Sequence, residues 1–266
     1  MTAPDEQPVI FERVGRIAVF TINRPAQRNA IDPDVSRLMN QFVAEFEDDP
    51  ELWVGVVTGA GDLAFSAGAD LKAIAAGRLA EITEVEPYGF AGLVKGQRGK
   101  PVVAAVNGAA LAGGCEITLA CDLVVASSAA RFGLPEVSRG IIAGAGGLQR
   151  LPRLIPPRKA LELILTGRPI DAAEALALGL VNEIAAPGSV LERGIELAEA
   201  VAANAPVAVR ESRAVAWTAI ASSEAAAWER SRLAWERVLA SEDAKKGPRA
   251  FAERRAPEWT GRRALP

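Results

Sequence analysis

Histidine is absent from this chain of 266 residues. Ser-His-Asp and Cys-His nucleophile systems need an imidazole, and the usual zinc sites need imidazoles or more thiolates than two cysteines provide. These kinds of active site are therefore excluded, and acid–base work falls mainly to carboxylates. Cys115 and Cys121 lie in one apolar helical pattern, so we interpret them as small buried side chains of a protein in a reducing compartment.

Long apolar runs and an excess of positive charge are also missing. No apolar run approaches the ~18 residues of a membrane span, and residues 1–6 are acidic, without the basic region and apolar core of a signal peptide. The net charge of −3 argues against a general nucleic-acid binder, which is usually basic. We therefore expect a cytoplasmic protein with neither a membrane nor nucleic acid as a partner.

Apolar segments, helical patterns and glycine-rich turns alternate along the first part of the chain. Two strands over residues 8–14 and 16–22 precede a helix that starts at Asp32 or Pro33 and ends near residue 48, and a strand over 52–58 follows. This alternation predicts an α/β core with stacked or parallel strands.

The last part of the chain is mostly helical in pattern. Half of all residues are apolar, which is enough for one large domain with a helical appendage. We place the α/β core in residues 1–200 and the helical region in residues 201–266. From Pro157 onward, helices are expected over residues 158–166, 172–178, 191–203, 206–222 and 223–240.

The stretch from residue 100 to 147 holds the residues most suited to chemistry. A buried strand over 101–106 leads to a bend, and Gly113 and Gly114 then open a short helix with Glu116 in its first turn. Glycines at a helix start allow close approach and leave amide N–H groups without intrahelical partners. Such amides can bind an anion or a developing oxyanion.

A second glycine-rich turn and a second carboxylate complete the candidate site. Gly68 could present another backbone amide, and two converging N–H groups would form an oxyanion hole. Glu136 follows Pro135, which stiffens the approach to it. Taken singly, the glycines could simply make turns, and Glu116 could simply favour a helix N-terminus. Taken together, they indicate a site with two carboxylates and two amides.

These motifs, in this order, resemble the enoyl-CoA hydratase (crotonase) family, and the resemblance covers nearly the whole chain. It implies an α/β crotonase (ClpP-like) fold of repeated ββα units with a C-terminal helical region. The segments that carry it are Ala67–Leu71, Lys100–Gly108, Gly113–Glu116, Pro135–Glu136, Gly144–Gly147, Leu165–Arg168, 172–181 and 241–255.

The resemblance also implies roles for individual residues. Glu116 and Glu136 would be catalytic, and the amides of Ala69 and Gly113 would form the oxyanion hole. Gly144 would lie near the catalytic water, in a turn where the family usually has proline in place of Ala143. The residues expected to bind the coenzyme A thioester are Arg28, Ala30, Ala67, Asp70, Leu71, Lys72 and Gly144. Residues 73–99 would line the acyl pocket.

The implied activity is reversible addition of water to a trans-2-enoyl-CoA in fatty acid or related acyl-CoA metabolism. No metal or other cofactor is implied, because coenzyme A is part of the substrate. Crotonases assemble as trimers or dimers of trimers, so the helical region would form a homotrimer or hexamer. Trp228 and Trp235, seven residues apart, would be core or interface residues.

Three alternatives stay open. Gly89–Leu93 and Phe251–Arg255 also resemble carnitinyl-CoA dehydratases. A double-bond isomerase would use Glu136 alone, and a non-catalytic acyl-CoA-binding protein would use neither carboxylate for turnover. Gly144–Gly147 does not predict a P-loop, because no Lys-Ser or Lys-Thr pair follows it. The basic cluster of Arg150, Arg153, Arg158 and Lys159 is interpreted as a solvated helix face, with an RNA-binding strip as the lesser alternative.

Overall fold

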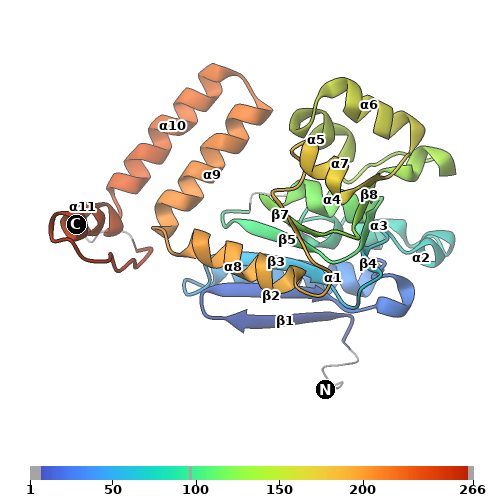
Figure 1. The fold of residues 1–266 in the computed structure, drawn as a ribbon, viewed down its shortest axis with the longest axis horizontal. Helices are drawn as coiled ribbons and strands as arrows, with labels where there is room; N and C mark the ends of the chain where they lie inside the picture. The colour runs from blue at the N-terminus through green and yellow to red at the C-terminus, as the bar shows by residue number, and fades with distance from the viewer. Residues whose placement is uncertain (1–6, 96–97, 263–266) are drawn as a thin grey trace.

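Two β-sheets form the centre of the structure, a computed structural model that describes residues 7–95 and 98–262 (Figure 1). The acidic segment 1–6, which shows no signal-peptide pattern, lies outside the described residues. The large sheet has the order β1 (Val9–Val14), β2 (Ile17–Ile22), β3 (Val54–Gly59), β5 (Val102–Val106), β7 (Leu123–Ser127) and β10 (Glu183–Ala185). The small sheet has the order β4 (Ala64–Ser66), β6 (Ala109–Leu111), β8 (Arg131–Gly133) and β9 (Ile170–Asp171).

The large sheet is parallel apart from the β1–β2 hairpin. Its central strands β3 and β5 are buried at every position, and their valines, alanines and glycines suit strands that are covered on both faces. Helix α8 (Val190–Ala202) covers one face. Helices α1 (Pro33–Asp48) and α4 (Gly113–Ala120) pack into the core on the other face.

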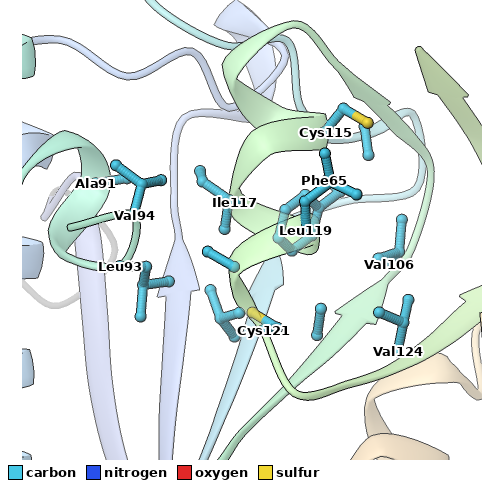
Figure 2. Packing of buried hydrophobic residues seen from close by; sticks show 14 of the residues in the cluster. Phe65, Ala91, Leu93, Val94, Val106, Cys115, Ile117, Leu119, Cys121 and Val124 are labelled. Carbon is cyan, nitrogen blue, oxygen red and sulfur yellow. The ribbon is translucent and has the colours of Figure 1, made fainter. Parts of the chain in front are cut away.

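Helix α4 is buried along its whole length. Figure 2 shows Cys115, Ile117 and Leu119 of this helix, with Leu93 and neighbouring residues on one side and Phe65 and its neighbours on the other. Cys115 and Cys121 are buried free thiols, as the apolar pattern predicted, and burial raises the pKa of each to about 12. Both are neutral packing residues.

The core repeats one unit, in which a strand of the large sheet leads to a short strand of the small sheet and then to a helix. The repeated ββα units of the predicted fold are confirmed, with β3–β4, β5–β6 and β7–β8 as successive strand pairs. The short strands of the small sheet were not predicted. The remaining elements of the core are η2 (Pro25–Gln27), α2 (Leu71–Ala75), α3 (Leu79–Thr83), η3 (Phe90–Gly92), η4 (Pro135–Arg139), α5 (Gly147–Leu154), α6 (Pro157–Thr166) and α7 (Ala172–Ala177).

The C-terminal helices extend away from the sheets. Helices α9 (Pro206–Ala221) and α10 (Glu224–Leu239) form an antiparallel hairpin, and α11 (Asp243–Ala252) lies at its base (Figure 1). Within residues 7–95 and 98–262, no helix has the length and apolar content needed to cross a membrane.

Asp122 connects this hairpin to the core. Its carboxylate accepts hydrogen bonds from Arg213 Nε at 2.7 Å and Trp217 Nε1 at 2.6 Å, both on α9. Its second oxygen accepts from the Val102 N–H at the start of β5, at 2.8 Å. One side chain therefore joins α9 to the large sheet.

We expect Asp122→Ala to lower the thermal unfolding midpoint by about 6–12 °C. The Asp122–Arg213 pair is partly buried, and removing one partner costs about 3 kcal/mol, the lower end for such pairs; each kcal/mol corresponds to ~2–4 °C in a domain of this size. Differential scanning calorimetry measures the change, with Asp62→Ala at an exposed position as the control. Equal midpoints for the two variants would contradict the linking role of Asp122.

Candidate active site

Three adjacent parallel strands of the small sheet lead into the three parts of the candidate site. Strand β4 is followed by the Gly68 turn, β6 by the start of α4, and β8 by Glu136. Because the carboxyl ends of neighbouring parallel strands lie at one edge of a sheet, segments that are far apart in the sequence meet here.

The Gly68 turn and the first turn of α4 make direct backbone contact. A Cβ atom on Gly68, whose φ is +87°, would lie 2.7 Å from the Gly113 nitrogen, and one on Gly114 would lie 2.0 Å from the Ser66 carbonyl oxygen. No side chain fits at either place. The backbones of Ala69 and Gly113, the two predicted oxyanion donors, are thereby held next to each other.

The amides of Ala69 and Gly113 are available to a ligand. Among the residues that the structure describes, neither N–H has a hydrogen-bond acceptor. Ala112, which precedes Gly113 at the helix start, has a φ of +50°, a strained value for alanine that costs about 1 kcal/mol or more. Strain of this kind persists where the surrounding structure over-determines the backbone, as it does beside the Gly68 turn.

Glu116 is buried one turn into α4, with 3% of its surface exposed. Its carboxylate accepts a hydrogen bond from the Gly147 N–H at 2.8 Å. Burial raises the pKa of Glu116 to about 7; the negative charge of Glu136 acts in the same direction, and the Gly147 hydrogen bond acts against both. Glu116 can therefore exchange a proton near neutral pH.

Glu136 is buried in η4 but is not held in the same way. Its Oε2 atom has no hydrogen-bond partner within the described part of the chain, and burial raises its pKa. A buried polar atom without a partner is costly and marks a place where a ligand group would be bound. The charge of Glu136 acts on Glu116, and the amide of Gly147 stabilises the charged form of Glu116 in turn. Their different surroundings suit one to act as a base and the other as an acid.

An aromatic ring lies beside the Gly113 amide. The tip of the Phe90 ring is 2.5 Å from the position that a Cβ on Gly113 would take. Asn40 of α1 holds the turn that carries this ring, donating to the Gly89 carbonyl at 2.8 Å and accepting from the Tyr88 N–H at 3.0 Å. From the segment predicted to line the acyl pocket, Phe90 therefore lies next to one of the two predicted oxyanion donors.

Asp70 is engaged by the protein itself. Its carboxylate accepts from the Lys72 N–H at 2.9 Å at the start of α2 and pairs with Arg24 at 3.2 Å. Although burial raises the pKa of Asp70, these hydrogen bonds outweigh burial and hold it below its usual value. Arg24 also donates to the Ala30 carbonyl at 2.7 Å. Arg24, which the sequence did not single out, therefore joins the loop before α1 to the turn that carries Ala69.

The other predicted thioester-binding residues lie near this loop or on the surface. Ala67 donates its N–H to the Arg28 carbonyl at 3.0 Å, which ties that turn to the Arg28 loop. The side chains of Arg28, Leu71 and Lys72 are exposed, Leu71 by 58%. Gly144 lies in an exposed turn, and the amide that binds Glu116 comes from Gly147, further along the same turn.

Comparison with known proteins agrees with this architecture. A family model described as enoyl-CoA hydratase/isomerase matches residues 12–262. A carnitinyl-CoA dehydratase from Salmonella typhi is 43% identical over 255 residues, covering 94% of this chain and 97% of the relative. The crystal structure of an enoyl-CoA hydratase from Mycobacterium tuberculosis H37Rv has a TM-score of 0.91 and 44% identity, covering 97% of this chain and 100% of that one. A carnitinyl-CoA hydratase from Mycobacterium avium has a TM-score of 0.78 and 48% identity, with the same coverage.

We expect Glu116→Gln to stabilise the fold at alkaline pH. The folded protein raises the pKa of Glu116 from 4.5 to about 7, so the stabilisation from its protonated form is full below pH 4.5 and is lost as the pH rises through 7. At 1.36 kcal/mol per unit, ionised Glu116 costs about 3 kcal/mol at pH 8. Glutamine still accepts the Gly147 hydrogen bond but carries no charge.

Thermal unfolding of the parent and variant at pH 5 and pH 8 measures this effect. The variant should be more stable at pH 8, and the difference should shrink to about 1 kcal/mol or less at pH 5. Glu84→Gln, at an exposed position, is the control for loss of one charge. A stability difference that is the same at both pH values would contradict the raised pKa.

Proposed function

Because the chain belongs to the enoyl-CoA hydratase/isomerase family, we propose that it adds water reversibly to a trans-2-enoyl-CoA thioester, with Glu116 and Glu136 as its catalytic carboxyl groups. The observation that carries this proposal is the pairing of two buried carboxyl groups in unlike surroundings. Glu116 has the Gly147 amide at 2.8 Å, whereas Glu136 Oε2 has no partner among the described residues.

The thioester carbonyl oxygen would accept hydrogen bonds from the Ala69 and Gly113 amides. Negative charge moves onto that oxygen as water adds at C3, and preorganised donors of this kind contribute about 3–4 kcal/mol each. The ionised Glu116 orients the water and takes its proton, while the protonated Glu136 gives a proton to C2. The site is restored when Glu116 loses its proton and Glu136 regains one. The mechanism uses no metal or redox cofactor, since coenzyme A belongs to the substrate.

The thioester would extend from this centre to the exposed side chains of Arg28, Leu71 and Lys72. A guanidinium and an ammonium suit phosphate oxygens, and an exposed leucine suits an apolar part of the ligand. Ala30, Ala67, Asp70 and Gly144 would shape the surrounding backbone. We place the reaction in cytoplasmic fatty acid or related acyl-CoA metabolism.

A second candidate is dehydration of a carnitinyl-CoA-type thioester, the reverse of the same chemistry. Two observations favour it: relatives named carnitinyl-CoA dehydratase cover almost the whole chain, and the Gly89–Leu93 segment places Phe90 beside the Gly113 backbone. Both candidates use the same carboxyl groups and differ in the acyl group that the Phe90 wall admits.

We further propose that the chain assembles as a homotrimer or a dimer of trimers through residues 201–266. Trp228 is 69% exposed, Trp235 is 65% exposed and Leu239 is 53% exposed, all on the α10 helix of the projecting hairpin (Figure 1). Tryptophan is enriched in protein interfaces, and a group of large exposed apolar side chains marks an association surface.

Loss of the conjugated enoyl-thioester absorbance tests the proposed reaction. With crotonyl-CoA, longer trans-2-enoyl-CoAs and the dehydration product of carnitinyl-CoA as substrates, we expect Glu116→Gln and Glu136→Gln each to lower kcat by at least ~10²-fold, since each removes an acid or base. Glu84→Gln should keep the parent activity. Undiminished turnover in both active-site variants would contradict the proposal.

The same assay separates the alternatives. Turnover that survives Glu116→Gln but not Glu136→Gln, with a shift of the double bond in place of hydration, would indicate an isomerase. Tight thioester binding without turnover by the parent would indicate a binding protein. Activity with the dehydration product of carnitinyl-CoA alone would identify the specialised dehydratase.

For the assembly, we expect the double variant Trp228→Ser and Trp235→Ser to shift the protein from trimer or hexamer towards monomer. Burial of two indole rings contributes several kcal/mol to an interface. Size-exclusion chromatography with multi-angle light scattering measures the mass. Leu63→Ser, at a residue 79% exposed on the loop after β3, is the control. An unchanged mass in the double variant would contradict the assigned interface.

A further inference from the structure

Arg150 does not belong to the solvated basic face that the sequence predicted. Arg153 and Arg158 are exposed, and Lys159 pairs with Glu162 at 3.0 Å. Arg150 is half-buried and points inward, where its Nη2 atom donates to the Val94 carbonyl at 2.6 Å and its Nη1 atom to the Ala145 carbonyl at 3.4 Å. The prediction of a surface role is therefore wrong for Arg150.

The Arg150 guanidinium lies directly on the turn that serves Glu116. Gly146 has a φ of +107°, and a Cβ atom there would be 1.9 Å from Arg150 Nη1. On one side of Gly146, the Ala145 carbonyl accepts from Arg150; on the other, the Gly147 N–H donates to the Glu116 carboxylate. The side chain thus fixes the turn that places an amide on the catalytic carboxylate.

The second hydrogen bond of Arg150 reaches the opposite wall of the site. Val94, 6% exposed, follows the η3 turn that carries Phe90. A buried carbonyl needs a donor, and Arg150 supplies it. A single guanidinium therefore joins the turn before Gly147 to the segment that carries Phe90. Only the forked geometry of arginine allows one side chain to make both hydrogen bonds.

Charge adds to this geometric role. Burial and the Glu136 charge raise the pKa of Glu116, and the positive charge of Arg150 acts against them. The other charged or titratable groups around this pair are Cys115 on α4, Arg139 on η4, which acts on Glu136, and Arg98, Cys121 and Arg153, which act on Arg150. Arg150 is the cation that faces Glu116 from α5.

We propose that Arg150 is a positioning residue for the hydration reaction, which holds the turn before Gly147 and the Val94 segment in register around Glu116. This inference rests on the proposed function, because Glu116 is the base in that mechanism. Arg150 acts through Glu116 and the Gly147 amide.

Three variants test the proposal. Arg150→Met removes the charge, and Arg150→Lys keeps the charge but cannot hydrogen-bond to both carbonyls. Arg153→Met is the control, because it removes an exposed charge from the same helix. The measurement is kcat/KM against pH with an enoyl-CoA. Because the base must be ionised, activity falls at low pH with a midpoint set by Glu116. Arg150→Met should move this midpoint upward by about one unit and lower the maximal rate ~10-fold or more.

Arg150→Lys should keep the parent's pH midpoint but lower the maximal rate ~10-fold. Arg153→Met should keep the parent's midpoint and maximal rate. A parent-like midpoint and rate in Arg150→Met would overturn the proposal, and so would an equal shift in Arg153→Met. If Arg150→Met does not fold, Arg150→Lys decides, because a parent-like rate in that variant would overturn the positioning role.

A second measurement does not depend on turnover. The pH dependence of thermal unfolding, recorded for each Arg150 variant with Glu116 and with Glu116→Gln, isolates the titration of Glu116. Arg150→Met should shift that titration upward, and no shift would overturn the proposal. If the parent turns over none of the thioesters, the proposed function fails, while this measurement still decides whether Arg150 controls Glu116.

Discussion

The close approach of two backbones at Gly68 and Gly114 is the constraint on which the rest of the site depends. A Cβ atom on Gly68 would meet the Gly113 nitrogen at 2.7 Å, and one on Gly114 would meet the Ser66 carbonyl at 2.0 Å. This contact seats α4 against the small sheet, brings the Ala69 and Gly113 amides together and buries Glu116 one turn further on. Any side chain at these positions would separate the parts that the chemistry needs to be adjacent.

The burial of Glu116 and Glu136 lowers the stability of the fold, although it suits the proposed chemistry. Glu116 and Glu136 are almost fully enclosed, one with a single amide and the other with an oxygen that no described residue contacts. An apolar side chain of similar size at either position would pack better. The proposed chemistry explains why the chain keeps two poorly solvated carboxyl groups, because proton transfer near neutral pH requires that their charged forms be only partly stabilised.

The sequence predicted the parts of the site whose residues have a distinctive spacing. It could not predict the parts that depend on which way a side chain points. Glycines before a helix and a carboxylate in its first turn are visible in the sequence, and the crotonase fold followed from several such motifs together. The strands of the small sheet have two or three residues each, too few to show an alternating pattern. Arg150 and Arg153 look alike in sequence, yet one points inward and the other outward. Only the packing of α5 distinguishes them.

The ββα repeat also indicates where members of such a family can differ. Strands β4, β6 and β8 each lead to one part of the reaction centre, so changes in them would displace the amides or the carboxyl groups. Residues 71–95, with α2, α3 and η3, are hydrogen-bonded to α1 through Ser36 and Asn40 and to α5 through the Arg150–Val94 hydrogen bond. Phe90 of this segment lies next to the Gly113 backbone. We therefore expect selection among acyl groups to change in this segment while the proposed chemistry of the thioester stays the same.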